Sequence, residues 1–152
     1  MTTPSERLAS LGLSLPAVAT PAGAYVPAVR DGDLIWSAGQ LPLVDGRLVE
    51  AGLVGAEVTA PRAAELARIA ALLALAAVAA EAGGLDAIRR IVKVVGFVAS
   101  SAGFTAQPGV VNGASELFVE VFGDAGRHAR SAVGVAALPL GAPVEIEIIA
   151  RV

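Results

Sequence analysis

RHARSAVGVAALPLGAPVEIEIIARV, residues 127–152, is the stretch of sequence that decides the fold class. Apolar residues alternate with charged ones along its second half: Val144, Ile146, Ile148, Ala150 and Val152 are separated by Glu145, Glu147 and Arg151 among others. A period of two predicts a strand with one buried face. LPLGAP, just before it, predicts a turn. We therefore expect residues from about 130 to 138 to pair with residues 144–152 as a terminal hairpin.

Upstream of this stretch, the sequence predicts two helices and a strand between them. The first helix is expected from Thr59 to Gly83, because Thr59 or Ala60 can cap it and Gly83 can end it. IVKVVGFVAS, residues 91–100, is nearly continuously apolar, which is typical of a strand buried on both faces. The second helix is expected over residues 110–122, where apolar residues recur at helical spacing.

The first 50 residues predict smaller elements. These are a short helix near Pro4, an extended connector over residues 14–23, a hairpin around Asp31-Gly32 and a turn at Asp45-Gly46. Trp36 is interpreted as a core or interface anchor rather than a ligand-stacking residue. The order of elements predicts an α+β domain with both helices on one face of a mixed sheet, leaving the other face free for subunit contacts.

Composition indicates an oligomer and disfavours several classes of function. The chain has 152 residues, of which 55% are hydrophobic and 16% charged, so little polar material is available to cover an isolated sphere. The net charge of −3, with Lys and Arg scattered along the sequence, disfavours nucleic-acid binding. The lack of Cys excludes thiol chemistry, the single His disfavours a metal site, and no nucleotide-binding motif is present. We expect no metal and no cofactor.

A membrane location is also not expected. The uncharged run IAALLALAAVAA, residues 69–80, is bounded by Arg68 and Glu81 and is shorter than the roughly 20 residues that span a bilayer. The N-terminal sequence contains Glu6 and Arg7 and no continuous apolar core, so it does not resemble a signal peptide. The expected location is the cytoplasm.

Arg130 and Glu145 are the candidate chemical groups. Arg130 is surrounded by the small residues Ala129, Ser131 and Ala132, which leave a guanidinium reachable as an anchor for a small organic acid. Glu145 is a candidate for handling water, although an alternating strand also places such a residue on a solvated face. For Arg130 the alternative is a surface ion pair. His128 is interpreted as a surface or loop residue, since no Ser-His-Asp constellation can be assembled. Supporting polar residues are Tyr25, Gln40 and Asn112.

The predicted hairpin keeps Arg130 and Glu145 apart within one chain. Arg130 is expected to pair near residue 150, which places Glu145 about five residues, or roughly 15 Å, further along the hairpin. Either the two residues are unrelated, or an oligomer brings Arg130 of one chain beside Glu145 of the next. The apolar composition favours the second possibility.

The segment HARSAVGVAALPLGAPVEIEIIA resembles the C-terminal signature of the RidA/YjgF reactive-intermediate deaminase family. GAYVPAV, WSAGQLP and VNGASELFVEVFG resemble further landmarks of that family, in the same order. The resemblance covers residues 22–152 and leaves residues 1–21 as an N-terminal extension. Ala24, Ala38 and Ala132 depart from residues common in the family, which indicates a divergent subgroup.

The resemblance implies a chorismate-mutase-like fold and a homotrimer with a site in each cleft between subunits. It implies hydrolysis of enamine or imine intermediates such as 2-aminoacrylate to 2-keto acids and ammonia, as in a 2-iminobutanoate/2-iminopropanoate deaminase, without a cofactor. Arg130 then corresponds to the residue that holds the substrate carboxylate, and Glu145 to the one that positions or activates water. The remaining pocket positions are Tyr25, Gly39, Asn112 and Ser131.

Two other functions stay open. One is a non-catalytic trimer that binds a small carboxylate metabolite through Arg130. The other is RNA cleavage, an activity associated with this family, which the acidic balance of charge and the lack of a second His disfavour.

Overall fold

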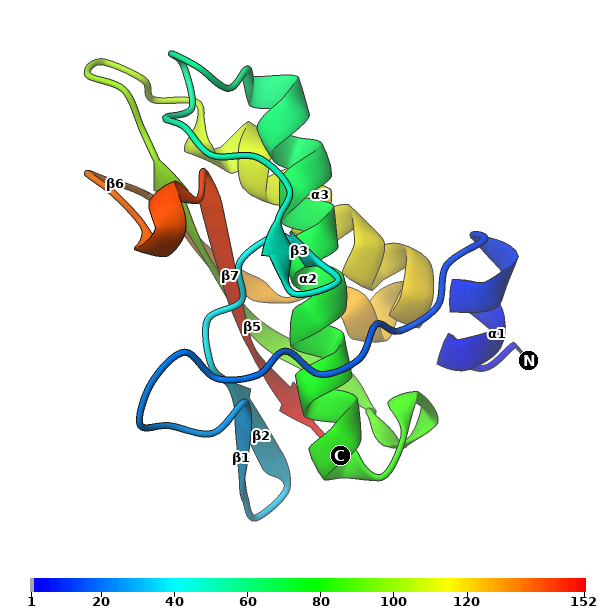
Figure 1. The fold of residues 1–152 in the computed structure, drawn as a ribbon. Coiled ribbons are helices and arrows are strands. Elements are labelled where there is room, and N and C mark those ends of the chain that lie inside the picture. Colours follow the sequence, from blue (N-terminus) through cyan, green and yellow to red (C-terminus); the bar gives the residue numbers. More distant parts are fainter. Residues whose placement is uncertain (1) are drawn as a thin grey trace.

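Two helices pack side by side on one face of a five-stranded mixed sheet. The computed structural model describes residues 2–152; Met1, the first residue of the predicted extension, lies outside them. The sheet order is β1-β2-β7-β5-β6, with β5 and β6 parallel and the other neighbours antiparallel. Figure 1 shows α2 and α3 against this sheet, and a small β3–β4 hairpin beside α2. The predicted α+β architecture is confirmed.

The elements have the following bounds. The strands are β1 (Ala28–Asp31), β2 (Leu34–Ser37), β3 (Leu43–Val44), β4 (Arg47–Leu48), β5 (Arg90–Ala99), β6 (Ala129–Val135) and β7 (Val144–Arg151). The α-helices are α1 (Pro4–Ser10), α2 (Ala60–Ala82) and α3 (Gln107–Phe122), and short 3₁₀ turns occur at Leu85–Ala87, Gly123–Gly126 and Pro139–Gly141. The short N-terminal helix and both early turns agree with the sequence-based expectations.

The predicted terminal hairpin is wrong. β7 pairs with β5 and β2, whereas β6 pairs with the opposite edge of β5, so β5 separates the two expected partners. β5, α3 and β6 form a strand–helix–strand unit, and such a crossover is what parallel pairing requires. The chain then turns at Pro139–Gly141 and crosses to the far side of β5, the strand with the most continuous apolar sequence.

Helix α2 begins and ends at the residues expected from the sequence. The side chain of Thr59 accepts a hydrogen bond from the Arg62 backbone N–H, and Gly83 ends the helix with a left-handed φ of 89°. The full helix has 23 residues and is long and apolar enough to span a membrane by length and composition alone. The uncharged run at residues 69–80, from which a membrane span was not expected, is only part of this helix. In the fold, most of its apolar stretch is buried against the sheet and α3, which accounts for its hydropathy.

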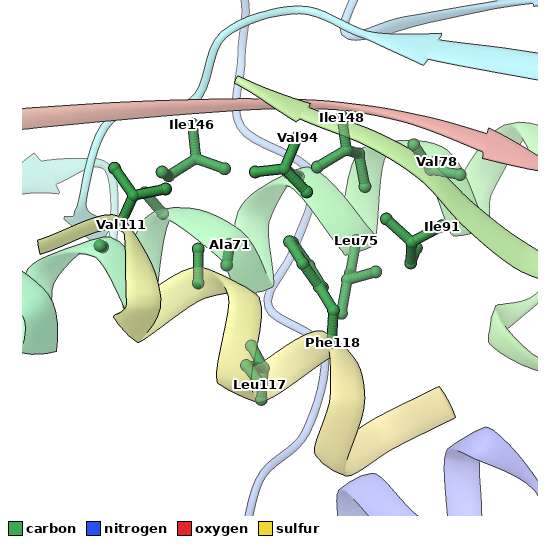
Figure 2. Packing of buried hydrophobic residues seen from close by; sticks show 14 of the residues in the cluster. Ala71, Leu75, Val78, Ile91, Val94, Val111, Leu117, Phe118, Ile146 and Ile148 are labelled. Carbon is green, nitrogen blue, oxygen red and sulfur yellow. The ribbon is translucent and has the colours of Figure 1, made fainter. Parts of the chain in front are cut away.

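The core lies between the sheet and the two helices. Figure 2 shows Ile146 and Ile148 of β7 and Val94 of β5 facing Leu75 of α2 and Phe118 of α3. All five side chains are at most 2% exposed. The layers approach closely because alanines line α2, where Ala63, Ala67, Ala70, Ala71 and Ala74 are fully buried.

Two glycines permit this close packing. A Cβ on Gly96 of β5 would lie 2.6 Å from Cγ1 of Val111 on α3. A Cβ on Gly113 of α3 would lie 2.7 Å from the backbone carbonyl carbon of Ala64 on α2. Both distances are shorter than van der Waals contact. A side chain larger than that of glycine at position 96 would push α3 away from the sheet, and one at position 113 would push α3 away from α2.

The other face of the sheet is only half covered. On β5, Ile91, Val94 and Val98 are fully buried, whereas Lys93 and Phe97 on the opposite face are partly exposed. The expectation of burial on both faces is therefore wrong for a single chain. Trp36 on β2 is 50% exposed, so it is not a core residue. This open, partly apolar face is where the predicted subunit contacts would form.

Candidate functional site

Helix α3 holds the guanidinium of Arg130 on the helix-covered side of the edge strand β6. Nη1 of Arg130 donates to Oδ1 of Asn112 at 2.7 Å and to Oγ of Ser115 at 3.2 Å. Nη2 donates to the backbone carbonyl of Pro108 at 3.3 Å. Residues 108, 112 and 115 are spaced by four and three, so they form one stripe along α3 that faces β6.

Arg130 keeps unused hydrogen-bonding capacity. None of the ion pairs within 4.0 Å in residues 2–152 involves it, so its charge is not neutralised by a neighbouring carboxylate. This contradicts the alternative of a surface ion pair. A guanidinium carries five N–H groups, and the three bonds to α3 leave Nε–H and one Nη2–H. These two donors form the fork that matches the two oxygens of a carboxylate.

His128 and Ser115 extend this hydrogen-bonded group. Nε2 of His128 lies 2.9 Å from Oγ of Ser115, and Nδ1 lies 2.6 Å from the Gly126 carbonyl oxygen. The imidazole also packs edge-on against Phe118, with ring centroids 5.8 Å apart. Burial lowers the pKa of His128; the Gly126 hydrogen bond opposes this shift and the nearby Arg130 charge adds to it. His128 lies in the segment just before β6, as expected for a loop residue, but it is half-buried and hydrogen-bonded to α3.

Sequence analysis missed Ser115 as a member of this group. Its spacing of three from Asn112 places both on one face of α3, which was an available signal. The contact with His128, however, depends on where β6 pairs with β5. That pairing was mispredicted, so the contact was not foreseeable from the expected hairpin.

Gly39 and Glu145 meet on the open face of the sheet. A Cβ on Gly39 would lie 2.8 Å from Cδ of Glu145, so the glycine makes room for the carboxyl group. The neighbouring Gln40 and Ile146 exchange backbone hydrogen bonds of 2.8 and 2.9 Å, which fixes the segment against β7. Burial raises the pKa of Glu145, and the charge of Glu147 adds to the effect. Glu145 is thus a carboxyl group that accepts a proton more readily than usual.

Within one chain, Arg130 and Glu145 lie on opposite faces of the sheet. Arg130 pairs with Val94, which pairs in turn with the buried Ile148, so all three point toward the helices. Glu145 is three residues from Ile148 along the same strand and therefore points the other way. Arg130 and Glu145 are therefore apart within one chain, as expected. The reason is that β5 lies between their strands and that they point to opposite faces, and not the register of a hairpin.

The other two predicted pocket residues lie apart from Arg130. Ser131 follows Arg130 on β6 and points to the open face, where its Oγ accepts a hydrogen bond of 3.2 Å from Nζ of Lys93. Tyr25 precedes β1, is 50% exposed, and its hydroxyl accepts a hydrogen bond of 3.1 Å from the Ala22 N–H. The single chain therefore groups Arg130 with Asn112 and Gly39 with Glu145, and leaves Ser131 and Tyr25 separate.

Two larger cavities lie elsewhere on the surface, one of them bordering His128. One, of about 670 Å³, lies between the N-terminal connector, the β3–β4 turn and α2, with Ile69, Leu72 and Leu73 in its wall. The other, of about 440 Å³, is lined by Arg90, Val92, Arg127, His128, Ala129 and Arg151. The fold thus gathers three arginines that the sequence separates. Asp124 and Asp33 pair with two of them, at 3.2 and 3.1 Å, and offset part of the charge.

Comparison with known proteins identifies the family. Residues 5–152 match the family model described as "YjgF/chorismate_mutase-like, putative endoribonuclease". Protein TCP17 of Trypanosoma cruzi is 44% identical over 144 residues, which cover 94% of this chain and 90% of that protein.

Two solved structures show the same fold. The protein Atu1372 of Agrobacterium tumefaciens, described as of unknown function, is 43% identical with a TM-score of 0.91, covering 99% of this chain and 93% of its own. E. coli TdcF with bound serine is 23% identical with a TM-score of 0.66, covering 91% and 95%. The family match and these likenesses show that the chain belongs to the YjgF/chorismate mutase-like (RidA) family.

Proposed function

We propose that this protein hydrolyses reactive enamine and imine intermediates, such as 2-aminoacrylate, to 2-keto acids and ammonia. Arg130 holds the substrate carboxylate, and Glu145 of a neighbouring subunit activates water. The site lies in a cleft between subunits of a homotrimer, and the protein acts in the cytoplasm.

The observation that carries this proposal is the state of Arg130. Its guanidinium is fixed by three hydrogen bonds to α3, has no carboxylate partner in the described residues, and keeps a fork of two N–H donors. A small 2-imino acid presents one carboxylate, which this fork can bind. The serine bound to E. coli TdcF is also a small molecule with a carboxylate and a nitrogen on the adjacent carbon, which supports the same substrate class.

The reaction needs an anchor, a water molecule and one group that moves a proton. 2-Aminoacrylate first tautomerises to the imine, whose carbon is electrophilic. Water adds to that carbon while Glu145 takes one proton from the water, and Glu145 then passes this proton to the imine nitrogen. The hydroxyl proton of the carbinolamine then passes to the nitrogen as the C–N bond breaks, so that ammonia leaves and the C–O bond becomes the carbonyl of the keto acid. The raised pKa of Glu145 suits this role, because a stronger carboxylate base takes a proton from water more readily.

Assembly follows from the placement of the two groups. Arg130 and Glu145 lie on opposite faces of one sheet, so a site that uses both requires two chains. The half-covered face that carries Glu145 and the exposed Trp36 supports contact with another subunit. Sedimentation equilibrium tests this point, since a monomer at micromolar concentration would contradict the shared site.

The testing experiment measures ammonia and keto-acid release from 2-aminoacrylate generated in the assay, with spontaneous hydrolysis subtracted. The wild type should accelerate release and Arg130→Ala should not, while both keep the same mass in solution. Arg47→Ala on the short strand β4 serves as the control for loss of an exposed arginine and should retain activity. A wild type that matches the blank would contradict the proposed hydrolysis.

A second candidate is a non-catalytic binder of small carboxylates. It is favoured by one observation: the anchor Arg130 is complete within a single chain, whereas the carboxyl group Glu145 is not near it. This alternative predicts saturable binding of pyruvate without turnover of 2-aminoacrylate. Isothermal titration beside the turnover assay distinguishes the two functions.

A further inference from the structure

Four side chains form a continuous hydrogen-bonded chain from His128 through Ser115 and Arg130 to Asn112. The chain runs from the Gly126 carbonyl to His128 at 2.6 Å, from His128 to Ser115 at 2.9 Å, and from Ser115 to Arg130 at 3.2 Å. Arg130 then contacts Asn112 at 2.7 Å. No hydrogen bond joins His128 to the guanidinium directly in the described residues, so the hydrogen-bonded link between them passes through Ser115.

The donors and acceptors in this chain permit one consistent arrangement for a neutral imidazole. A guanidinium only donates, so Oγ of Ser115 accepts from Arg130 and has its single hydrogen left for Nε2 of His128. The contact of Nδ1 with the Gly126 carbonyl, at 2.6 Å, requires Nδ1 to carry the imidazole hydrogen, so Nε2 of the neutral ring is the unprotonated nitrogen that accepts from Ser115. That hydrogen points at the Gly126 carbonyl, which can only accept. The opposite tautomer would set bare Nδ1 against a carbonyl oxygen at 2.6 Å.

The surroundings of His128 favour its neutral form. The ring is partly buried against Phe118, and burial disfavours the charged form. Arg130 lies on one side through Ser115, and Arg90, Arg127 and Arg151 line the same cavity as His128. Asp124 and Asp33, the acidic residues paired with two of these arginines, are exposed and face their own partners.

We propose that His128 is a positioning residue that, through Ser115, holds Arg130 in the orientation that binds the substrate carboxylate. The inference rests on the proposed function, because it assigns the group that orients the anchor of that same site. The hydrogen bond to His128 fixes the rotation of the Ser115 hydroxyl, so that a lone pair of Oγ faces Nη1 of Arg130. Without that hydrogen bond the hydroxyl rotates, and the guanidinium keeps only Asn112 and the Pro108 carbonyl on α3.

Substitutions at both positions test this role. Ser115→Ala removes the link, His128→Leu removes the acceptor, and His128→Gln keeps an acceptor oxygen near the position of Nε2. Two of the three hydrogen bonds that hold the guanidinium on α3 remain when the one to Ser115 is lost, so we expect a modest loss of about five- to tenfold in affinity, equivalent to about 1–1.4 kcal/mol. We therefore expect Ser115→Ala and His128→Leu each to weaken pyruvate binding five- to tenfold, and His128→Gln to restore most of it. Pyruvate is the probe because it is the product of 2-aminoacrylate hydrolysis.

Two readouts separate positioning from a merely structural role. In turnover, KM should rise in Ser115→Ala and His128→Leu while kcat changes little, because the anchor and not the water is disturbed. The double variant Ser115→Ala/His128→Leu should bind pyruvate no more weakly than either single variant, since both break one chain. Nitrogen NMR of the imidazole should report a protonated Nδ1 in the wild type. Ser10→Ala in α1 is the control for loss of a serine hydroxyl outside the site.

The outcomes are distinguishable. Wild-type affinity for pyruvate in folded Ser115→Ala and His128→Leu would overturn this inference and leave the proposed function intact, provided that Arg130→Ala still abolishes turnover. Absence of pyruvate binding by the wild type would overturn both. If Ser115→Ala does not fold, the comparison of His128→Leu with His128→Gln decides, because equal affinities for pyruvate would again overturn the inference.

Discussion

Replacing Gly39 by alanine tests whether Glu145 is the group that activates water. The added Cβ would lie 2.8 Å from Cδ of Glu145 and 3.1 Å from its Cγ, where ordinary contact begins at 3.4 Å. The carboxyl carbon must therefore move by at least 3.4 − 2.8 = 0.6 Å, and Oε1, which is closer still to the new methyl group, must move further. The atoms that move belong to a flexible side chain, so the fold should tolerate the change.

This displacement predicts a loss of rate rather than of binding. A misplacement of about 1 Å in a reacting group can cost as much as 10²-fold in rate. We expect kcat for 2-aminoacrylate hydrolysis to fall by about 10- to 100-fold in Gly39→Ala. Affinity for pyruvate should stay within about twofold of the wild type, because Arg130 is held by α3 on the other face of the sheet.

The assay follows keto-acid formation with coupled reduction, beside isothermal titration of pyruvate and a urea denaturation curve. Glu145→Gln should lose at least as much rate as Gly39→Ala. The double variant Gly39→Ala/Glu145→Asp, whose carboxylate is one methylene shorter, should regain part of the lost rate. A folded Gly39→Ala with wild-type kcat would refute the assignment of Glu145 as the water-activating group.

Three further predictions concern the anchor, the ionisation of Glu145 and the packing of α3. Arg130→Lys should weaken pyruvate binding by about 10- to 100-fold in isothermal titration, because an ammonium cannot reproduce the planar set of bonds to α3 and to a carboxylate. Burial raises the pKa of Glu145, so its ionised form is disfavoured in the folded state. Glu145→Gln should therefore unfold at higher urea concentration than the wild type at pH 8, and this advantage should disappear below about pH 4.5, where the carboxyl group is protonated in both states; an advantage that persists there would contradict the linkage. Gly113→Ala should destabilise by about 1–3 kcal/mol in urea, because the new methyl group meets the Ala64 backbone, whereas Gly109→Ala, which meets nothing within 4 Å, should stabilise by about 0.5–1 kcal/mol; equal effects of the two would contradict the packing argument.

The helices were predictable from sequence because their signals are local. Thr59 caps α2 and Gly83 ends it, and the helix spans Ala60–Ala82, inside the expected limits. Each of these residues acts through its own backbone or its near neighbours. No information about the rest of the fold is needed to recognise them.

The pairing of the C-terminal strands was not predictable from the same kind of signal. Alternation along Val144–Arg151 indicates one buried face, and the structure confirms it, but alternation does not specify a neighbouring strand. The turn at LPLGAP was also correct, since Leu140 and Gly141 have positive φ values of 61° and 74°. The signal for the actual pairing was the order β5, α3, β6, because a helical crossover between strands favours parallel pairing.

The candidate site was predictable as a set of residues but not as an arrangement. Arg130 and Asn112 are in contact at 2.7 Å, and Gly39 lies against Glu145, so the residues named from the sequence do form two groups. The sequence could not show that β5 lies between the groups, since this depends on long-range pairing. Ser115 was missed for the same reason: its partners Arg130 and His128 come from β6 and the segment before it.

The division of the site between two faces has a consequence for how activity depends on assembly. The orientation of Arg130 is determined by α3 and β6 of its own chain, through Asn112, Ser115 and the Pro108 carbonyl. Glu145 is oriented by β7 and the Gly39 segment on the opposite face. The proposed binding of a carboxylate thus draws on contacts inside one chain, whereas the proposed attack of water draws on two chains. Subunit contact in this protein would therefore determine the rate of hydrolysis without being needed to form the anchor.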